Sequence, residues 1–286
     1  PATNVSIANL GAEIIWADVD ENSGNISPES VRRLISKYGE EVKAVVAVDW
    51  GGYPCDYDNL RDAIPEEVYL IEDAAHAITA EYKKRKVGSI ADITCFSFQA
   101  IKHITTGDGG LICCLREDDF LRANRLKWFG IDRNRENRGW QDDIYESGFK
   151  FHMNDIAATM GLLQLPRLPQ IVERRRRIAQ IYEKTLIDLG VDFQQGNYQC
   201  KSSYWLFTLM IDSRTDFIDS LNSQGIEASP VHRRNDTYTA FKGSSIDRDD
   251  LEGVEKFDQR MVCIPVGDWL SDEDVNQVIK ALEKGW

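Results

Sequence analysis

Four short apolar runs between residues 40 and 115 constrain what this chain can fold into. The runs show almost no alternation of polar and apolar residues, and they lie at 42–48, 68–71, 93–98 and 111–115. Such runs are typical of strands that are covered on both faces. Helical patterns lie before and between them, at 27–36 and 58–64. Alternating strands and helices predict an α/β fold with a largely parallel sheet.

Two chemically complementary side chains stand where strands of this sheet are expected to end. Asp73 closely follows the second run, and Lys102 follows the third run just before a glycine-rich turn. Ligands of open α/β sheets gather at the carboxyl ends of strands. An amine and a buried carboxylate suit pyridoxal phosphate (PLP), because the lysine forms a Schiff base with the cofactor aldehyde while the carboxylate keeps the pyridine nitrogen protonated. Ser97, on the strand before Lys102, is a candidate hydroxyl donor to the cofactor phosphate. Taken singly, each residue has another interpretation, since a strand-end lysine is usually solvated and Asp73 can cap a helix.

Several motifs occur in a fixed order around these residues. They are Glu72-Asp-Ala-Ala-His-Ala77, Val87-Gly-Ser-Ile-Ala-Asp92, Phe96-Ser-Phe-Gln-Ala-Ile-Lys102 and Gly107-Asp-Gly-Gly110. In this order and spacing they resemble the DegT/DnrJ-type nucleotide-sugar aminotransferases, and the resemblance spans nearly the whole chain. It implies a PLP-dependent transferase of fold type I, similar to aspartate aminotransferase and acting in polysaccharide biosynthesis. In such an enzyme an amino group passes from an amino acid, for which glutamate is expected, to a keto group on a nucleotide-linked deoxysugar.

The resemblance also implies roles for single residues. Lys102 is the implied catalytic Schiff-base lysine and later the proton carrier, and relatives with histidine at this position are sugar dehydratases, so the lysine favours amination. Asp73 is implied to pair with the pyridinium nitrogen, and Ser97 to contact the phosphate. His76 is implied to lie against the cofactor ring, although a lone histidine is more often structural.

Two further segments depart from the family pattern or leave alternatives open. Within residues 148–154, relatives often carry an asparagine that reaches the phosphate of the neighbouring subunit's cofactor, whereas this chain has Lys150 and His152 at the usual places. Lys150 would serve a phosphate as a point charge. Around residues 231–236 the resemblance implies a substrate-side loop. Its residues available for the sugar or its diphosphate are His232, Arg233 and Arg234, but an exposed polar loop has the same composition. A homodimer with sites at the subunit interface is also implied.

The pattern changes near residue 155, from short strands to long helical segments interrupted by Pro166 and Pro169. This change predicts a large PLP-binding domain at 1–165 and a smaller C-terminal α/β domain at 166–286. Within the second part we expect a strand at 204–211, a helix at 216–224 and a last helix opened by a capping box at Ser271. The basic run at 174–177 is expected on a solvated helix face.

Composition limits the partners and the compartment. The net charge is −13, with 47 acidic and 34 basic residues, which argues against nucleic acid or an anionic membrane as the main partner. The six cysteines show neither metal spacing nor a disulfide framework. Unpaired thiols suit a reducing compartment, so a cytoplasmic protein without a metal is expected. The expected partners are a nucleotide-linked keto-sugar and an amino-acid donor.

The first residues depart most from the family. Residues 1–11 align with a family segment that normally follows a Gly-Thr turn, where a helix N-terminus binds the cofactor phosphate. The resemblance therefore places an N-terminal segment of the family outside this sequence, and weak retention of PLP is expected. The alternative function is that of a truncated, catalytically weak or inactive family member that acts as a non-enzymatic remnant or interaction partner.

Overall fold

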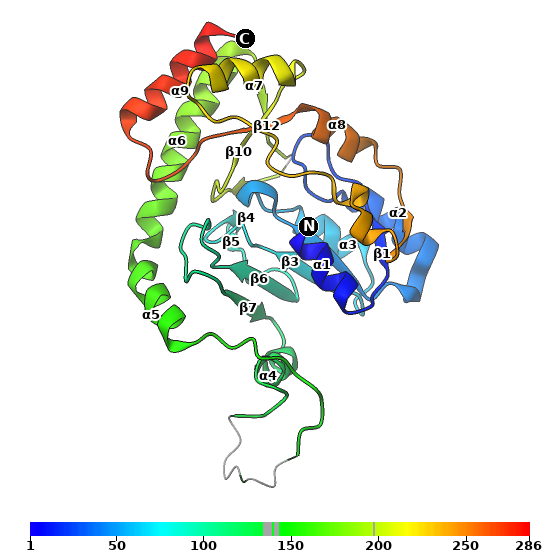
Figure 1. Ribbon diagram of the computed structural model, residues 1–286. Helices are drawn as coiled ribbons and strands as arrows, with labels where there is room; N and C mark the ends of the chain where they lie inside the picture. The colour runs from blue at the N-terminus through cyan, green and yellow to red at the C-terminus, as the bar shows by residue number, and fades with distance from the viewer. Residues whose placement is uncertain (134–138, 140–142, 197) are drawn as a thin grey trace.

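A mainly parallel sheet lies at the centre of the large part of the molecule (Figure 1). The computed structural model describes residues 1–133, 139, 143–196 and 198–286. In spatial order the strands are β2 (Ala44–Val48), β3 (Tyr69–Asp73), β6 (Ile93–Ser97) and β7 (Gly110–Cys114). β2, β3 and β6 are parallel, and β7 pairs antiparallel to β6. The α/β class and the four strands predicted from the apolar runs are confirmed.

Two helices cover one face of this sheet. α2 (Pro28–Tyr38) and α3 (Tyr57–Ala63) pack with β2 and β3 around one apolar core. The core includes Val31, Val45, Ala47, Leu60, Val68 and Leu70. α2 begins as predicted, because the Ser27 hydroxyl accepts a hydrogen bond from the Ser30 amide and Pro28 occupies the first helical position.

The C-terminal part builds a second sheet with its own core. β8 (Asp192–Phe193), β10 (Phe207–Met210) and β12 (Met261–Ile264) pair antiparallel, with β10 in the middle. Three helices pack on this sheet, namely α6 (Leu168–Leu189), α7 (Arg214–Ser223) and α9 (Asp272–Lys284). The capping box predicted at Ser271 is confirmed, since its hydroxyl accepts from the Asp274 amide and the Asp274 carboxylate accepts from the Ser271 amide.

Short strand pairs join the early and late parts of the chain. β1 (Ile14–Trp16) pairs parallel with β11 (Ser245–Arg248), and β4 (Glu81–Tyr82) pairs with both β5 (Arg85–Lys86) and β9 (Cys200–Lys201). The remaining helices are α1 (Ala2–Asn9), α4 (Glu117–Leu126), α5 (Asp155–Gln164) and α8 (Glu252–Arg260). Short 3₁₀ turns lie at Gly39–Glu41, Trp50–Gly52, Leu165–Arg167, Asn235–Thr237 and Thr239–Phe241. The division of the chain at residues 165 and 166 stays a prediction.

The prediction that the arginine run at 174–177 is solvated is wrong for Arg175. Its side chain is only 2% exposed, and its guanidinium donates to the carbonyl of Val266 at 2.9 Å and lies 3.5 Å from Asp268. The helical spacing explains the error, because Arg175 shares a face of α6 with Ile178 and Tyr182, which are fully buried. A guanidinium tolerates such a place when carbonyl and carboxylate acceptors surround it.

No helix in the described ranges is long and apolar enough to cross a membrane. Nor do the described residues include a group of three or more His, Cys, Asp or Glu side chains placed to hold a metal ion.

Candidate functional site

The carboxyl ends of β3 and β6 place the predicted acid, hydroxyl and amine at one edge of the sheet. Asp73 and Ser97 are the last residues of these parallel strands, and the register pairs Asp73 with Cys95. Lys102 follows Ser97 after a turn in which its amide donates to the carbonyl of Gln99. Parallel pairing therefore brings the three predicted residues to the same edge.

The electrostatics of Lys102 identify it as an unusual lysine. Burial lowers the pKa of its amine to about 8, while the negative charge of Asp73 acts in the opposite sense. Among the described residues no hydrogen bond or ion pair fixes the Lys102 amine. A half-buried amine with a lowered pKa is a better nucleophile near neutral pH than a solvated lysine.

Asp73 is held in place by two donors. One carboxylate oxygen accepts from the Ala75 amide at 3.1 Å, and the other accepts from the Thr3 hydroxyl at 2.5 Å. No helix begins after Asp73, because residues 74–80 form turns, so the helix-cap alternative for this residue is wrong. The hydrogen bond from the Ala75 amide belongs to the first of these turns and leaves the carboxylate at the sheet edge.

His76 lies beside this edge as a neutral ring with a spare nitrogen. Burial, and then the positive charge of Lys102, hold the pKa of His76 well below its usual range. Its Nδ1 atom is buried and has no hydrogen-bond partner among the described residues. Buried polar atoms are rarely left unpaired, so this nitrogen indicates a place for a ligand atom or a water.

Trp205 joins the site although the sequence did not single it out. Its indole stacks on His76 with ring centroids 3.7 Å apart, and the Lys102 Nζ lies 4.0 Å from the indole centroid. The indole N–H donates to the carbonyl of Ile101 at 2.9 Å. The apolar run at 204–211 contains Trp205, and a tryptophan in such a run looks like any core residue.

The loop at 231–236 brings only part of its predicted set to the site. The His232 ring is nearly parallel to His76 at 6.0 Å and lies edge-on to Trp50 at 5.2 Å. Arg234 instead makes a two-pronged ion pair with Asp236, with distances of 3.1 and 2.9 Å.

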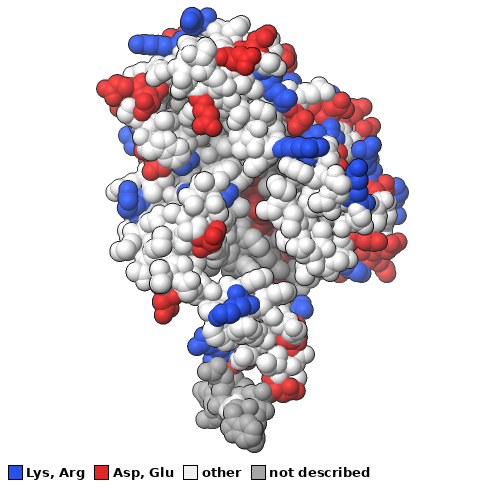
Figure 2. Space-filling model, in the orientation of Figure 1, with Lys and Arg blue, Asp and Glu red and all other residues white. Residues whose placement is uncertain are grey.

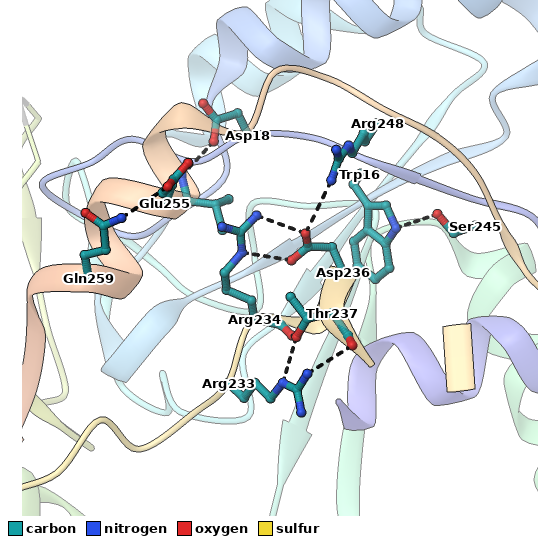
Figure 3. A network of polar contacts seen from close by, with 11 residues as sticks. Trp16, Asp18, Arg233, Arg234, Asp236, Thr237, Ser245, Arg248, Glu255 and Gln259 are labelled. Atoms are coloured by element: carbon teal, nitrogen blue, oxygen red, sulfur yellow. Dashed lines mark hydrogen bonds and ion pairs between the residues drawn. The ribbon is translucent and has the colours of Figure 1, made fainter. Parts of the chain in front are cut away.

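Figure 3 shows this ion pair, with Arg233 beside it. Arg233 is exposed and donates to the hydroxyl and carbonyl oxygens of Thr237 at 2.8 and 3.2 Å. A substrate role for the three residues of this loop stays a prediction.

Residues 143–154, which we call the projecting segment, extend from the body together with α4 (Figure 1). They include Lys150 and His152. Both residues pack on Trp128, with the Lys150 Nζ 4.6 Å from the ring centroid and the His152 ring 3.7 Å away. Loss of hydration and the charge of Lys150 lower the pKa of His152. In the described residues no contact joins either side chain to Asp73 or Lys102 of the same chain.

Comparisons with known proteins agree over nearly the whole chain. The model of the DegT/DnrJ/EryC1/StrS aminotransferase family matches residues 1–283. The chain is 30% identical to the spore coat polysaccharide biosynthesis protein SpsC of Bacillus subtilis (strain 168), covering 98% of this chain and 75% of that protein. It is 28% identical to GDP-perosamine synthase of Vibrio cholerae, covering 97% of this chain and 75% of that protein.

Solved structures are similar in fold as well as in sequence. The sugar aminotransferase CalS13 from Micromonospora echinospora matches with a TM-score of 0.91 and 30% identity, covering 99% of this chain and 78% of that one. The PLP-form of Spr1654 from Streptococcus pneumoniae matches with a TM-score of 0.86 and 25% identity, covering 99% of this chain and 77% of that one.

Proposed function

Because the chain belongs to the DegT/DnrJ/EryC1/StrS aminotransferase family and is therefore a PLP-dependent transaminase, we propose that it transfers the amino group of glutamate to a keto group on a nucleotide-linked deoxysugar. The observation that carries this proposal is the half-buried amine of Lys102 at the same sheet edge as the Asp73 carboxylate. The names of relatives, among them GDP-perosamine synthase, support a nucleotide sugar as the acceptor. A non-enzymatic role is not favoured, because the matching family model and the similar structure of CalS13 are those of aminotransferases.

The residues at this edge fit PLP. The donor set offers an amine for covalent attachment at Lys102, a carboxylate for the ring nitrogen at Asp73 and a hydroxyl for the phosphate at Ser97. The unpaired Nδ1 of His76 is a further polar atom that a bound ring with polar substituents would satisfy. When bound, PLP supplies the electron sink that makes the α-proton of an amino acid acidic.

Lys102 is proposed to hold the cofactor and to move the proton. Its pKa of about 8 leaves a useful fraction of the amine unprotonated near neutral pH, so that the amine can attack a carbonyl and later accept or return a proton. Asp73 provides a fixed negative charge, since two donors hold its carboxylate in one place. His76 and His232 both have lowered pKa values because of burial, so they offer neutral rings rather than competing cations.

We propose a second copy of this chain as the partner protein. Large apolar side chains are exposed on β7, on α4, on the projecting segment and on α5. They include Leu111, Ile112, Leu115, Phe120, Phe149, Phe151, Ile156, Leu162 and Leu163. Several large exposed apolar side chains on one chain are expected where a partner covers them. The strand β7 was predicted to be covered on both faces, yet Leu111 and Ile112 are about half exposed in the single chain.

The distribution of charge does not oppose pairing of two copies. On the face shown in Figure 2, Lys, Arg, Asp and Glu are interspersed. Lys150 and His152 lie on the projecting segment beside this surface, so pairing of two copies would allow them to reach the other copy's cofactor phosphate. A cation beside a phosphate forms a charge-assisted contact, which is the role proposed for Lys150.

The decisive experiment supplies purified protein with PLP, glutamate and a panel of nucleotide-linked keto-sugars, and detects the amino-sugar product by mass spectrometry. Lys102→Ala is expected to lower the turnover rate by roughly 10² to 10⁴ fold, the range for loss of a positioned proton-transfer group. Lys86→Ala, at an exposed lysine on β5, is the matched control and should retain the wild-type rate. Turnover by Lys102→Ala at the wild-type rate would refute the assignment, and a colourless protein with no spectral response to PLP would favour the inactive alternative.

A further inference from the structure

Trp205 contacts both predicted cofactor residues that flank it. Its ring lies under the Lys102 ammonium at 4.0 Å from the centroid and stacks on the His76 ring at 3.7 Å. The indole N–H donates to the carbonyl of Ile101, the residue directly before Lys102. One hydrogen bond thus ties the ring to the backbone next to Lys102.

The backbone that presents Trp205 is held in an uncommon conformation. Tyr204 has a φ angle of +47°, which non-glycine residues rarely adopt. Three polar contacts hold it there: its hydroxyl donates to Glu183 at 2.6 Å, its amide donates to the Ser202 hydroxyl at 3.0 Å, and its carbonyl accepts from Arg175 at 3.3 Å. Strained backbone persists where the surroundings over-determine it, and such places cluster at functional sites.

Trp205 also lines a cavity. It has a volume of about 430 Å³, and its lining includes Ile101, Trp205 and Trp269. Neither Lys102 nor His76 is part of that lining. The Trp205 indole thus both lines the cavity and contacts the Lys102 amine.

We propose that Trp205 is a positioning residue for Lys102, which fixes the amine over its ring and keeps water in the neighbouring cavity away from it. The proposal rests on the proposed function only for the role of Lys102. Two opposing effects of the indole follow. A cation over an aromatic face is attracted to it, which favours the protonated amine, whereas exclusion of water favours the neutral amine.

The balance of these effects makes the proposal testable. Burial is the main cause of the lowered pKa of Lys102. Trp205→Ala joins the cavity to the site and admits water, so the pKa of the amine should rise by about one unit toward that of a solvated lysine. Trp205→Phe keeps a ring over the amine and should leave the pKa close to that of the wild type.

The experiment measures the reactivity of Lys102 in the full chain after removal of bound PLP. Trinitrobenzenesulfonate labelling is followed by mass spectrometry of the peptide containing residue 102, between pH 6.5 and 10. Because only the neutral amine reacts, a one-unit rise makes labelling of Trp205→Ala about tenfold slower than that of wild type at pH 7. Labelling of the exposed Lys86, measured in the same digest, corrects for differences in reagent reactivity between samples.

The matched control is Trp269→Ala, since this indole also lines the cavity but packs against Arg175 and not against Lys102. Its labelling profile should equal that of the wild type, and circular dichroism checks that each variant is folded. A Trp205→Ala profile that coincides with the wild-type profile overturns the proposal. The labelling experiment needs no sugar substrate and no bound cofactor. If the labelling profile of Trp205→Ala were shifted but the protein had no transaminase activity, the proposed function would be wrong and the role of Trp205 would still be supported.

Discussion

The adjacent residues Lys102 and His103 lie in different environments. Lys102 faces the site, whereas His103 is only 5% exposed and its ring Nε2 lies 2.9 Å from the carbonyl of Ser203. A carbonyl only accepts, so this nitrogen carries the proton of a neutral ring. Burial, and then the positive charge of Arg175, lower the pKa of His103 to about 3. The interior therefore holds His103 neutral throughout the physiological pH range.

His103 is expected to make the protein sensitive to acid. In the unfolded chain its pKa is close to 6.5, so between pH 6.5 and 3 the unfolded state binds a proton that the folded state does not, and stability falls as the pH falls. His103→Gln removes this titration and keeps a donor for the carbonyl of Ser203. Between pH 7.5 and pH 5 the wild type should lose about 2 kcal/mol more unfolding free energy than the variant. Urea unfolding at the two pH values measures the difference, and equal losses would contradict the prediction.

The residues that sequence could and could not predict differ in kind. Asp73 and Lys102 were predictable, because their chemistry is visible in the residue type and their place is set by the strands before them. Trp205 was not, because its role depends on the positive φ angle of Tyr204 and on a hydrogen bond to a turn about a hundred residues earlier. Arg175 was misread because four consecutive arginines look solvated, although helical spacing puts one of them on the buried face.

At the scale of elements, the junction of β2 and β3 carries two buried acids behind the site. Asp49 follows β2 and Glu72 lies in β3, and both are fully buried. One oxygen of Asp49 accepts from the Cys55 amide and the Tyr57 hydroxyl, and one oxygen of Glu72 accepts from the Thr94 hydroxyl. The second oxygen of each acid has no partner in the part of the chain described. Burial, and then the charge of Glu72, raise the pKa of Asp49 well above its usual range.

These two strands are therefore expected to lose stability as the pH rises. A carboxyl with a raised pKa keeps a proton in the folded state that the unfolded chain has released, so stability falls above the unfolded pKa of about 4. Asp49→Asn has the same shape and no titration. Its unfolding free energy should fall less between pH 5.5 and 8.5 than that of the wild type, as measured by urea unfolding.

The control for this pair is Glu40→Gln, at an exposed carboxyl outside the sheet. Its unfolding free energy should depend on pH in the same way as that of the wild type. If Asp49→Asn also left the pH dependence of the unfolding free energy unchanged, Asp49 and Glu72 would not retain a proton that the unfolded chain releases.

Strands could be predicted from the sequence where the pattern within the strand itself was sufficient. The non-alternating runs predicted β2, β3, β6 and β7 to within a few residues, since burial leaves its mark on each run itself. The pairings of β1 with β11 and of β4 with β9 were not predictable, because these strands have two to four residues and meet partners far along the chain. The strand expected at 204–211 begins only at Phe207, because the residues before it form the loop that carries Trp205.

At the scale of the whole molecule, the projecting segment needs an explanation that one chain does not provide. Phe151 on this segment and Ile156 at the start of α5 are 74% and 78% exposed, and Lys150, next to Phe151 in the chain, has no carboxylate partner among the described residues. A second copy of the chain would cover the apolar side chains and give the cation a phosphate to bind. In a closed two-fold pair each segment reaches the other subunit, so both sites would be shared.

Mixed dimers test whether the sites are shared between subunits. Lys102→Ala lacks the amine and Lys150→Met lacks the proposed phosphate cation, so each variant alone should bind PLP weakly or not covalently. When the two are co-expressed, a mixed dimer has one site with Lys102 from one subunit and Lys150 from the other. Random pairing then restores about a quarter of all sites. The measurement is covalent PLP content at limiting PLP, after borohydride reduction and mass spectrometry.

A site formed within a single chain predicts a different result. If Lys150 served the cofactor of its own chain, every site in the mixture would lack one of the two residues, and the covalent PLP content would equal the average of the two variants measured apart. Co-expression of Lys102→Ala with Lys86→Met is the matched control, because every intact site takes its Lys102 from the second chain, so about half of all sites are intact whether or not the subunits share residues. Restoration to about a quarter of the wild-type content, against that control, requires two chains at each site, since no single chain in the mixture carries both lysines.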